Sequence, residues 1–185
     1  MSPLPSSMSI IFQKIPPYTV PSDPSGRARL LMGLDNPSSL VGIPSHYDIP
    51  VLCSPLKRAA LTVQGPRITH LPELREIPFD VNLLTSKEER TSLTSVIVRR
   101  AFLRGWESDS LLITRLILQK EVIQLLDYVR PYEDCLVISH SFRLKIIQGY
   151  LQFGDAFFVH ANLLGMIMRE DQRTFAFNEQ FTLEH

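Results

Sequence analysis

Residues 51–64, VLCSPLKRAALTVQ, and residues 135–151, CLVISHSFRLKIIQGYL, decide the fold of this chain. In both stretches a short apolar run with strand-forming residues leads directly into a helical pattern. The first helix is predicted to begin at Ser54-Pro55 and to end near Gln64, because serine is a favoured N-cap and proline suits the first helical position. Ser141 can cap the second helix in the same way. The two junctions therefore predict strand-to-helix units of an α/β fold.

Patterns elsewhere in the chain add further elements. Strands are predicted in three apolar runs, Ser9–Lys14, Ile49–Cys53 and Leu136–Ser139. Besides the two helices above, helical patterns run from a capping box at Ser86 and Glu89 to about Gly105, and from Leu111 to Val129. We interpret the tail, roughly from Leu163 to Phe181, as two strands around Glu170-Asp171-Gln172.

Short strands that alternate with helices indicate the fold class. They predict an α/β three-layer sandwich with a mostly parallel central sheet and helices on both faces. The length of 185 residues suits one domain, and we assign residues 1–182 to it. Leu183-Glu184-His185 resembles the start of a purification tag, so we assign no function to His185.

Composition limits the partners that the protein can attract. The 19 basic and 19 acidic side chains balance, so we expect neither nucleic acid nor a membrane surface as a partner. No apolar run reaches the roughly 18 residues of a membrane span. The N-terminus shows no secretion signal, which favours a cytoplasmic protein. Cys53 and Cys135 each lie in an apolar run and are expected to be buried thiols in a reducing compartment. The histidines and cysteines are scattered, which predicts no metal site, and the oligomeric state stays open.

The two junctions also hold the candidate chemistry. In a parallel sheet both fall at the carboxyl edge of the strands, where α/β sheets bind ligands and helix N-termini attract anions. Arg58, in the first turn of its helix, can hold phosphate oxygens with its guanidinium, and His140 can donate to a phosphate or act covalently. The alternative is structural: Arg58 as a surface arginine and His140 as a histidine with its bonds satisfied under a loop.

Four motifs in a fixed order resemble the histidine phosphatase superfamily, the phosphoglycerate mutase-like proteins. The motifs are Cys53–Thr62, similar to a strand followed by SPLxRAxxTA; Leu74-Arg75-Glu76-Ile77, similar to LxEI; Gly105-Trp106-Glu107-Ser108 with Arg115, similar to GES…R; and Val137-Ile138-Ser139-His140, similar to VSHGG. A fainter echo of RxxG…D.PLT lies at Arg29–Gly33 and Asn36–Leu40.

This resemblance implies roles for three residues. Arg58 corresponds to the arginine that binds the phosphoryl group, Glu76 to the general acid, and His140 to the second active-site histidine. The family chemistry needs no cofactor and no metal. The implied ligand is phosphate or a phosphorylated small molecule.

The sequence departs from the family where the nucleophile should be. The family's first strand ends in Arg-His-Gly, whereas here it ends in Gln13-Lys14-Ile15. A lysine amine is protonated near neutral pH, so Lys14 is a poor nucleophile but a plausible counter-charge for phosphate, unless it is only a solvated strand end. The family's two glycines after the second histidine are Ser141 and Phe142. The Ser141 backbone can still contact phosphate, while Phe142 is expected to crowd the site.

Other histidines offer weak substitutes. His46 is expected at the wrong edge of the sheet, and His160 is expected to pack against the core. His70 could reach the right edge, six residues before Glu76, although a loop histidine is the commoner case. We expect Glu107 and Arg115 to brace the loop over the site.

Three functions follow from these observations. The first is a catalytically degenerate phosphatase-like protein, in which Gln13, Lys14, Arg58, His140 and Ser141 bind phosphate without efficient turnover. The second is an active phosphomonoesterase with a displaced nucleophile. The third is a protein-interaction scaffold with a vestigial pocket. The missing nucleophile favours the first, because deleting one member of a catalytic unit removes most of its rate.

Overall fold

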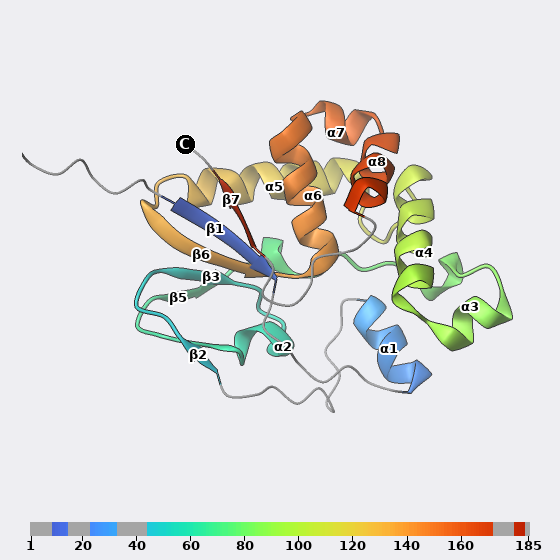
Figure 1. Cartoon of the computed structure of the whole chain (residues 1–185), viewed down its shortest axis with the longest axis horizontal. Helices are drawn as coiled ribbons and strands as arrows, with labels where there is room; N and C mark the ends of the chain where they lie inside the picture. Colours follow the sequence, from blue (N-terminus) through green and yellow to red (C-terminus); the bar gives the residue numbers. More distant parts are fainter. Residues whose placement is uncertain (1–8, 15–22, 33–43, 172–179, 184–185) are drawn as a thin grey trace, which may run out of the picture.

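A five-stranded sheet forms the centre of the computed structural model, which describes residues 9–14, 23–32, 44–171 and 180–183 (Figure 1). Its strands, in spatial order, are β5 (Ile68–His70), β3 (Val51–Cys53), β6 (Asp134–Ser139), β1 (Ser9–Lys14) and β7 (Gln180–Leu183). All neighbours are parallel except β7, which runs antiparallel to β1 and pairs Leu183 with Ile10. A small second sheet joins β2 (Ser45–His46) to β4 (Val63–Gln64).

Helices cover both faces of the central sheet and the space beyond its carboxyl edge (Figure 1). They are α1 (Pro24–Leu31), α2 (Lys57–Ala60), α3 (Lys87–Ser92), α4 (Ser95–Glu107), α5 (Arg115–Val129), α6 (Ser141–Phe153), α7 (Ala156–Val159) and α8 (Asn162–Asp171), with 3₁₀ turns η1 (Pro72–Leu74) and η2 (Val81–Leu83). The long helices α5 and α6 lie over one face, and the short α2 lies on the other. The predicted fold class, a mostly parallel sheet between helices, is confirmed.

The helix predicted from Ser54 to Gln64 is wrong in its extent. Only Lys57–Ala60 is helical, with Leu56 at the N-cap. Ser54 instead folds a tight turn, in which its hydroxyl accepts the Leu56 N–H at 3.3 Å. Val63 pairs with Ser45 in the small sheet, so the chain leaves the helix as soon as α2 has made one turn.

The single helix predicted from Ser86 to Gly105 is two helices. Leu93 ends α3 in the left-handed region, with φ 43°, and Thr94 then caps α4 by accepting the Ile97 N–H at 3.3 Å. The capping box is only half formed: the Ser86 hydroxyl accepts the Glu89 N–H, but the Glu89 carboxylate accepts from Thr85. Arg104 on α4 also binds this carboxylate, which draws it away from the Ser86 backbone.

The tail and the start of α5 also differ from the prediction. Residues 162–171 form helix α8 rather than a strand, because Leu164, Ile167 and Met168 are buried at helical spacing. The helix predicted from Leu111 begins at Arg115, where Thr114 is the N-cap. In the rest of the predicted tail, Gln180 and Phe181 lie in strand β7, while residues 172–179 lie outside the described residues, as do Gly33 and residues 36–40 of the faint motif.

Two apolar clusters hold the layers together. The larger lies between the sheet and helices α4, α5 and α6, and the smaller packs Ala59 of α2 against the opposite face. Cys53 and Cys135 are free and buried, and burial raises the pKa of the Cys53 thiol to about 12 and that of Cys135 to about 11. Among the described residues, no helix is long and apolar enough to span a membrane.

Gly149 permits the close approach of α6 and α7, and we predict that Gly149→Ala destabilises the protein. A Cβ at this position would collide with the ring of Phe157, which is fully buried and packs against Trp106 at 5.3 Å between ring centroids. Overpacking costs about 1–3 kcal/mol, whereas replacing glycine in a helix gains about 1 kcal/mol. Chemical denaturation should therefore show a net loss of up to about 2 kcal/mol. Phe157→Leu should make the alanine less costly, and strictly additive effects would contradict the collision.

Candidate functional site

Three neighbouring strands end together and bring the candidate residues to one edge. In the sheet register, Lys14 at the end of β1 lies opposite Ser139 at the end of β6, and Cys53 at the end of β3 lies opposite Ile138. The next residues along β3 and β6 are Ser54 and His140. The two strand-to-helix junctions therefore meet at the carboxyl edge of the sheet, where α2 and α6 begin (Figure 1).

His140 is the N-cap residue of α6 and is only 2% exposed. Its Nε2 atom lies 2.9 Å from the Ser54 hydroxyl, which ties the two junctions together. Burial lowers the pKa of His140 well below its usual value of 6.5, and the charges of Arg58, Arg143 and Lys14 lower it further. The imidazole is therefore neutral near pH 7.

Among the charges that act on this imidazole, the charge of Arg58 has the largest effect. Arg58 lies in α2 and is 3% exposed, so its guanidinium is held inside the protein at the same edge. Its charge acts on both His140 and Glu76. The geometry thus groups an arginine, a neutral histidine and a carboxyl group, as the sequence predicts.

Glu76 reaches the edge from the loop after η1 and is half-buried. Its Oε1 atom accepts the backbone N–H of Ile77 at 3.0 Å and that of Arg143 at 3.1 Å. Burial raises the pKa of Glu76, and it outweighs these two bonds and the nearby arginine charges, which lower it. A carboxyl group in this state can hold a proton at a higher pH than a surface glutamate can.

Arg143 is a site residue that the sequence reasoning missed. It is 1% exposed, its Nε donates to the Arg75 carbonyl at 2.8 Å, and its other guanidinium nitrogen contacts Glu121 of α5 at 2.7 Å. The available signal was a charged residue in the first turn of a helix whose neighbours, Leu144 and Ile146, are apolar. Such a cation needs a buried partner.

The remaining predicted phosphate-binding residues reach the edge from different sides. Ile10 and Phe12 of β1 pack on the larger cluster, so Lys14 shares their face by strand alternation, whereas Gln13 lies on the opposite face. Ser141 is the first residue of α6 and is buried. Phe142, expected to crowd the site, instead packs in the core, where its ring stacks on Phe102 at 4.0 Å.

The other histidines stay outside this group. His70 ends β5 at the predicted edge and is exposed. His46 is exposed on the small sheet and contacts Asp48 at 3.2 Å. His160 is also exposed, so its predicted packing against the core is wrong: the chain turns at the end of α7, and Phe157 and Phe158 occupy the core instead.

The loop before α5 is braced by a pair that differs from the predicted one. Arg115 bonds with Asp109, whose carboxylate accepts the Arg115 backbone N–H at 2.8 Å, and its guanidinium lies over the ring of Trp106. Of Glu107 and Arg115, the two residues expected to brace this loop, Arg115 makes these contacts.

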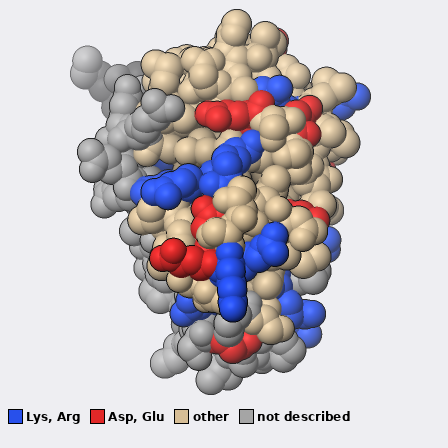
Figure 2. Space-filling view, turned by 90° about the vertical axis from the view of Figure 1, so that its right-hand side faces the viewer, with Lys and Arg blue, Asp and Glu red and all other residues tan. Residues whose placement is uncertain are grey.

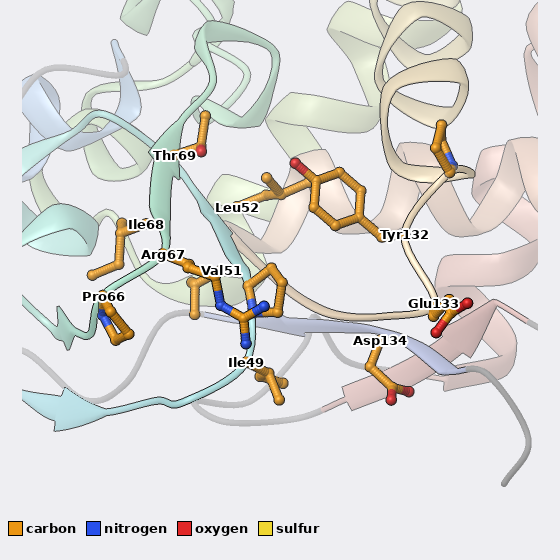
Figure 3. A pocket seen from close by; sticks show the side chains of 12 residues that line it. Ile49, Val51, Leu52, Pro66, Arg67, Ile68, Thr69, Tyr132, Glu133 and Asp134 are labelled. Atoms are coloured by element: carbon orange, nitrogen blue, oxygen red, sulfur yellow. The ribbon is translucent and has the colours of Figure 1, made fainter. Parts of the chain in front are cut away.

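A hollow lined by described residues lies at the opposite edge of the sheet. It has a volume of about 710 Å³ and is surrounded by the loops that precede β3, β5 and β6, with Arg67 and Tyr132 among its lining residues (Figure 3). It holds neither Arg58 nor His140, and its charged residues are solvated. The candidate site is therefore defined by its converging buried side chains and not by this hollow.

Charge on the surface is mixed where it can be seen. The face that carries α1, α3 and α4 shows basic and acidic side chains interspersed (Figure 2). Within the described ranges, no three histidine, cysteine or acidic side chains come together in a group that could hold a metal ion.

A solved phosphatase structure shares this fold. The alpha-ribazole phosphatase of Shigella flexneri is 16% identical, with a TM-score of 0.52 over 96% of this chain and 95% of that one. A mycobacterial glucosyl-3-phosphoglycerate phosphatase, solved in complex with inorganic phosphate, is 12% identical, with a TM-score of 0.48 over 96% and 90% of the two chains. The sequence matches no protein-family model and no curated protein.

Both of these phosphatases are members of the histidine phosphatase superfamily. The likeness to the alpha-ribazole phosphatase shows that the chain has the fold of that superfamily, as the four sequence motifs predict. At such low identity it shows the fold alone.

The neutral, buried state of His140 predicts a pH dependence of stability. The unfolded chain takes up a proton on this histidine near pH 6.5, while the folded chain does so only at lower pH. The contribution of His140 is therefore complete above pH 6.5 and is lost as the pH falls, by at most about 1.4 kcal/mol per pH unit. The difference in unfolding free energy between wild type and His140→Gln should shrink on acidification. The exposed His160→Gln should show no such trend, and an identical trend in both variants would contradict the buried neutral imidazole.

Proposed function

We propose that the protein binds phosphate or a phosphorylated small molecule at the carboxyl edge of its sheet and turns it over slowly or not at all. The observation that carries this proposal is the convergence of buried Arg58 and His140 with Lys14 at one edge. Buried arginine is suited to an oxyanion because its planar fork can bind two oxygens at once.

The ligand contacts follow from the positions of the predicted residues. Arg58 would bind the phosphoryl oxygens, and Lys14 would add a second positive charge. His140 would donate from its imidazole, Ser141 would offer the first backbone N–H of α6, and the Gln13 amide would bind from the other face. Each of these residues lies at or next to the end of a strand or the start of a helix.

Low turnover is proposed because the chain lacks an imidazole at the end of β1. Lys14 is the last residue of that strand, and a protonated amine cannot attack phosphorus. The imidazole that is present, His140, is bonded to Ser54. The end of β1 thus retains a positive charge that can bind phosphate, although the family's nucleophile is missing there.

The proposal predicts binding without efficient hydrolysis. Vanadate, phosphate or sulfate at about a hundredfold excess over its Kd should raise the melting temperature by about 5–10 °C. Arg58→Met should abolish this shift, and Arg67→Met at the opposite edge should leave it unchanged. Hydrolysis of an aryl phosphate should stay near background. A wild-type protein that no oxyanion stabilises would instead support the interaction scaffold.

A second candidate function, phosphomonoester hydrolysis, is favoured by the Ser54–His140 contact of 2.9 Å. A hydroxyl bonded to a neutral imidazole can be activated as a nucleophile. In such a reaction the Ser54 oxygen attacks phosphorus, its proton passes to His140 Nε2, and the leaving oxygen takes the proton held by Glu76. Water then attacks the phosphoserine and gives its proton to the Glu76 carboxylate, while the bond between phosphorus and the Ser54 oxygen breaks and that oxygen takes its proton back from His140.

Turnover and its chemical intermediate distinguish the two candidates. Hydrolysis well above background, abolished by both Ser54→Ala and His140→Gln, would show that the proposal of low turnover is wrong. The trapped phosphoprotein should then survive acid, as a phosphoserine does and a phosphohistidine does not. Loss of activity in His70→Gln alone would assign the displaced nucleophile to His70.

A further inference from the structure

Glu76 places a titratable carboxyl group in the site that we propose for an oxyanion. Its carboxylate accepts the N–H of Arg143, the third residue of α6, so it already occupies part of the helix N-terminus that attracts anions. The charge of Arg58 also acts on it. A bound oxyanion would therefore share the N-terminus of α6 and the charge of Arg58 with Glu76.

The loop that carries Glu76 is fastened at three consecutive residues. The Ser139 hydroxyl donates to the Leu74 carbonyl at 2.7 Å, and Arg143 Nε donates to the Arg75 carbonyl at 2.8 Å. Glu76 itself accepts the two backbone N–H bonds described above. The carboxyl group cannot swing away from an incoming anion without breaking these buried bonds.

We propose that binding of an oxyanion at this site is coupled to the uptake of one proton by Glu76, so that affinity rises as the pH falls. This inference rests on the proposed function and names its regulation. Two negative charges in one buried space repel each other strongly, and a fixed carboxylate removes this repulsion by taking up a proton. The protonated carboxyl group can then donate a hydrogen bond to the ligand.

The other charges around Glu76 support this assignment. Arg58 of α2 is the cation that it shares with the ligand, while Arg143 is bonded to Glu121 of α5. His140, at the start of α6, is neutral, and the charge of Lys14 on β1 acts on this imidazole. Burial already raises the pKa of Glu76 in the free protein, and an additional anion raises it further.

Sulfate is the ligand for the test because its charge stays constant from mildly acidic to mildly alkaline pH. Isothermal titration calorimetry of the wild type should show affinity falling by up to about tenfold per pH unit above the pKa of Glu76. Titrations in two buffers of different ionisation enthalpy should show the uptake of about one proton per sulfate. Glu76→Gln, which keeps the shape but not the charge, should bind sulfate more tightly at pH 8 and take up almost no proton.

Two control variants separate other sources of a pH effect. Glu73→Gln removes an acid from the same loop and should behave as the wild type does. His140→Gln should retain the proton uptake, because that proton is assigned to Glu76. Proton uptake by wild type alone is informative even if a variant folds poorly.

The possible failures are distinguishable. Sulfate binding that takes up no proton in the wild type, or that is weakened by Glu76→Gln, would overturn the role of Glu76 and leave the anion site intact. Absence of sulfate binding in the wild type at every pH would overturn the proposed function and this inference with it.

Discussion

Parallel pairing of β6 with both β1 and β3 sets the position of the candidate site. Because the register places Lys14 opposite Ser139 and Cys53 opposite Ile138, the residues that follow all emerge at one edge. A slip of one residue would turn each side chain to the other face of the sheet. The hydrogen bond between Ser54 and His140 then joins the two helix starts, so this pairing determines local geometry as well as overall topology.

Burial of two arginines, Arg58 and Arg143, at this edge requires compensation within the protein. Arg143 is compensated by Glu121 and by the Arg75 carbonyl, and its own backbone N–H binds Glu76. Leaving one member of a buried ion pair without its partner costs about 3–5 kcal/mol, so this arrangement holds the Glu76 loop firmly. Arg58 adds its charge to the same space. The resulting field suits a bound oxyanion better than it suits further positive charge.

The fold of this chain is shared with a solved phosphatase, whereas the end of β1 departs from the motif of the superfamily that the sequence resembles. Its architecture is that of the histidine phosphatase superfamily, and the positions of Arg58, Glu76 and His140 agree with the motifs that indicated it. The end of β1 carries Lys14, whose protonated amine is positively charged and so can attract phosphate, but is not a nucleophile. A proposal of binding with little turnover follows from this combination, and the Ser54 hydroxyl beside a neutral imidazole is the feature that argues for hydrolysis.

The sequence by itself determined the three main strands, the two strand-to-helix junctions and the meeting of Arg58, Glu76 and His140, because apolar runs and motifs of fixed spacing are local signals. It did not determine the break at Leu93, the helix at 162–171 or the inward position of Phe142. These depend on which partner each segment meets, and packing overrides local preference there. Nor did it identify Arg143, whose burial becomes favourable only when Glu121 and the Arg75 carbonyl, distant in sequence, lie beside it. Only the tertiary structure could decide this, because a buried charge is stabilised by neighbours that no local pattern specifies.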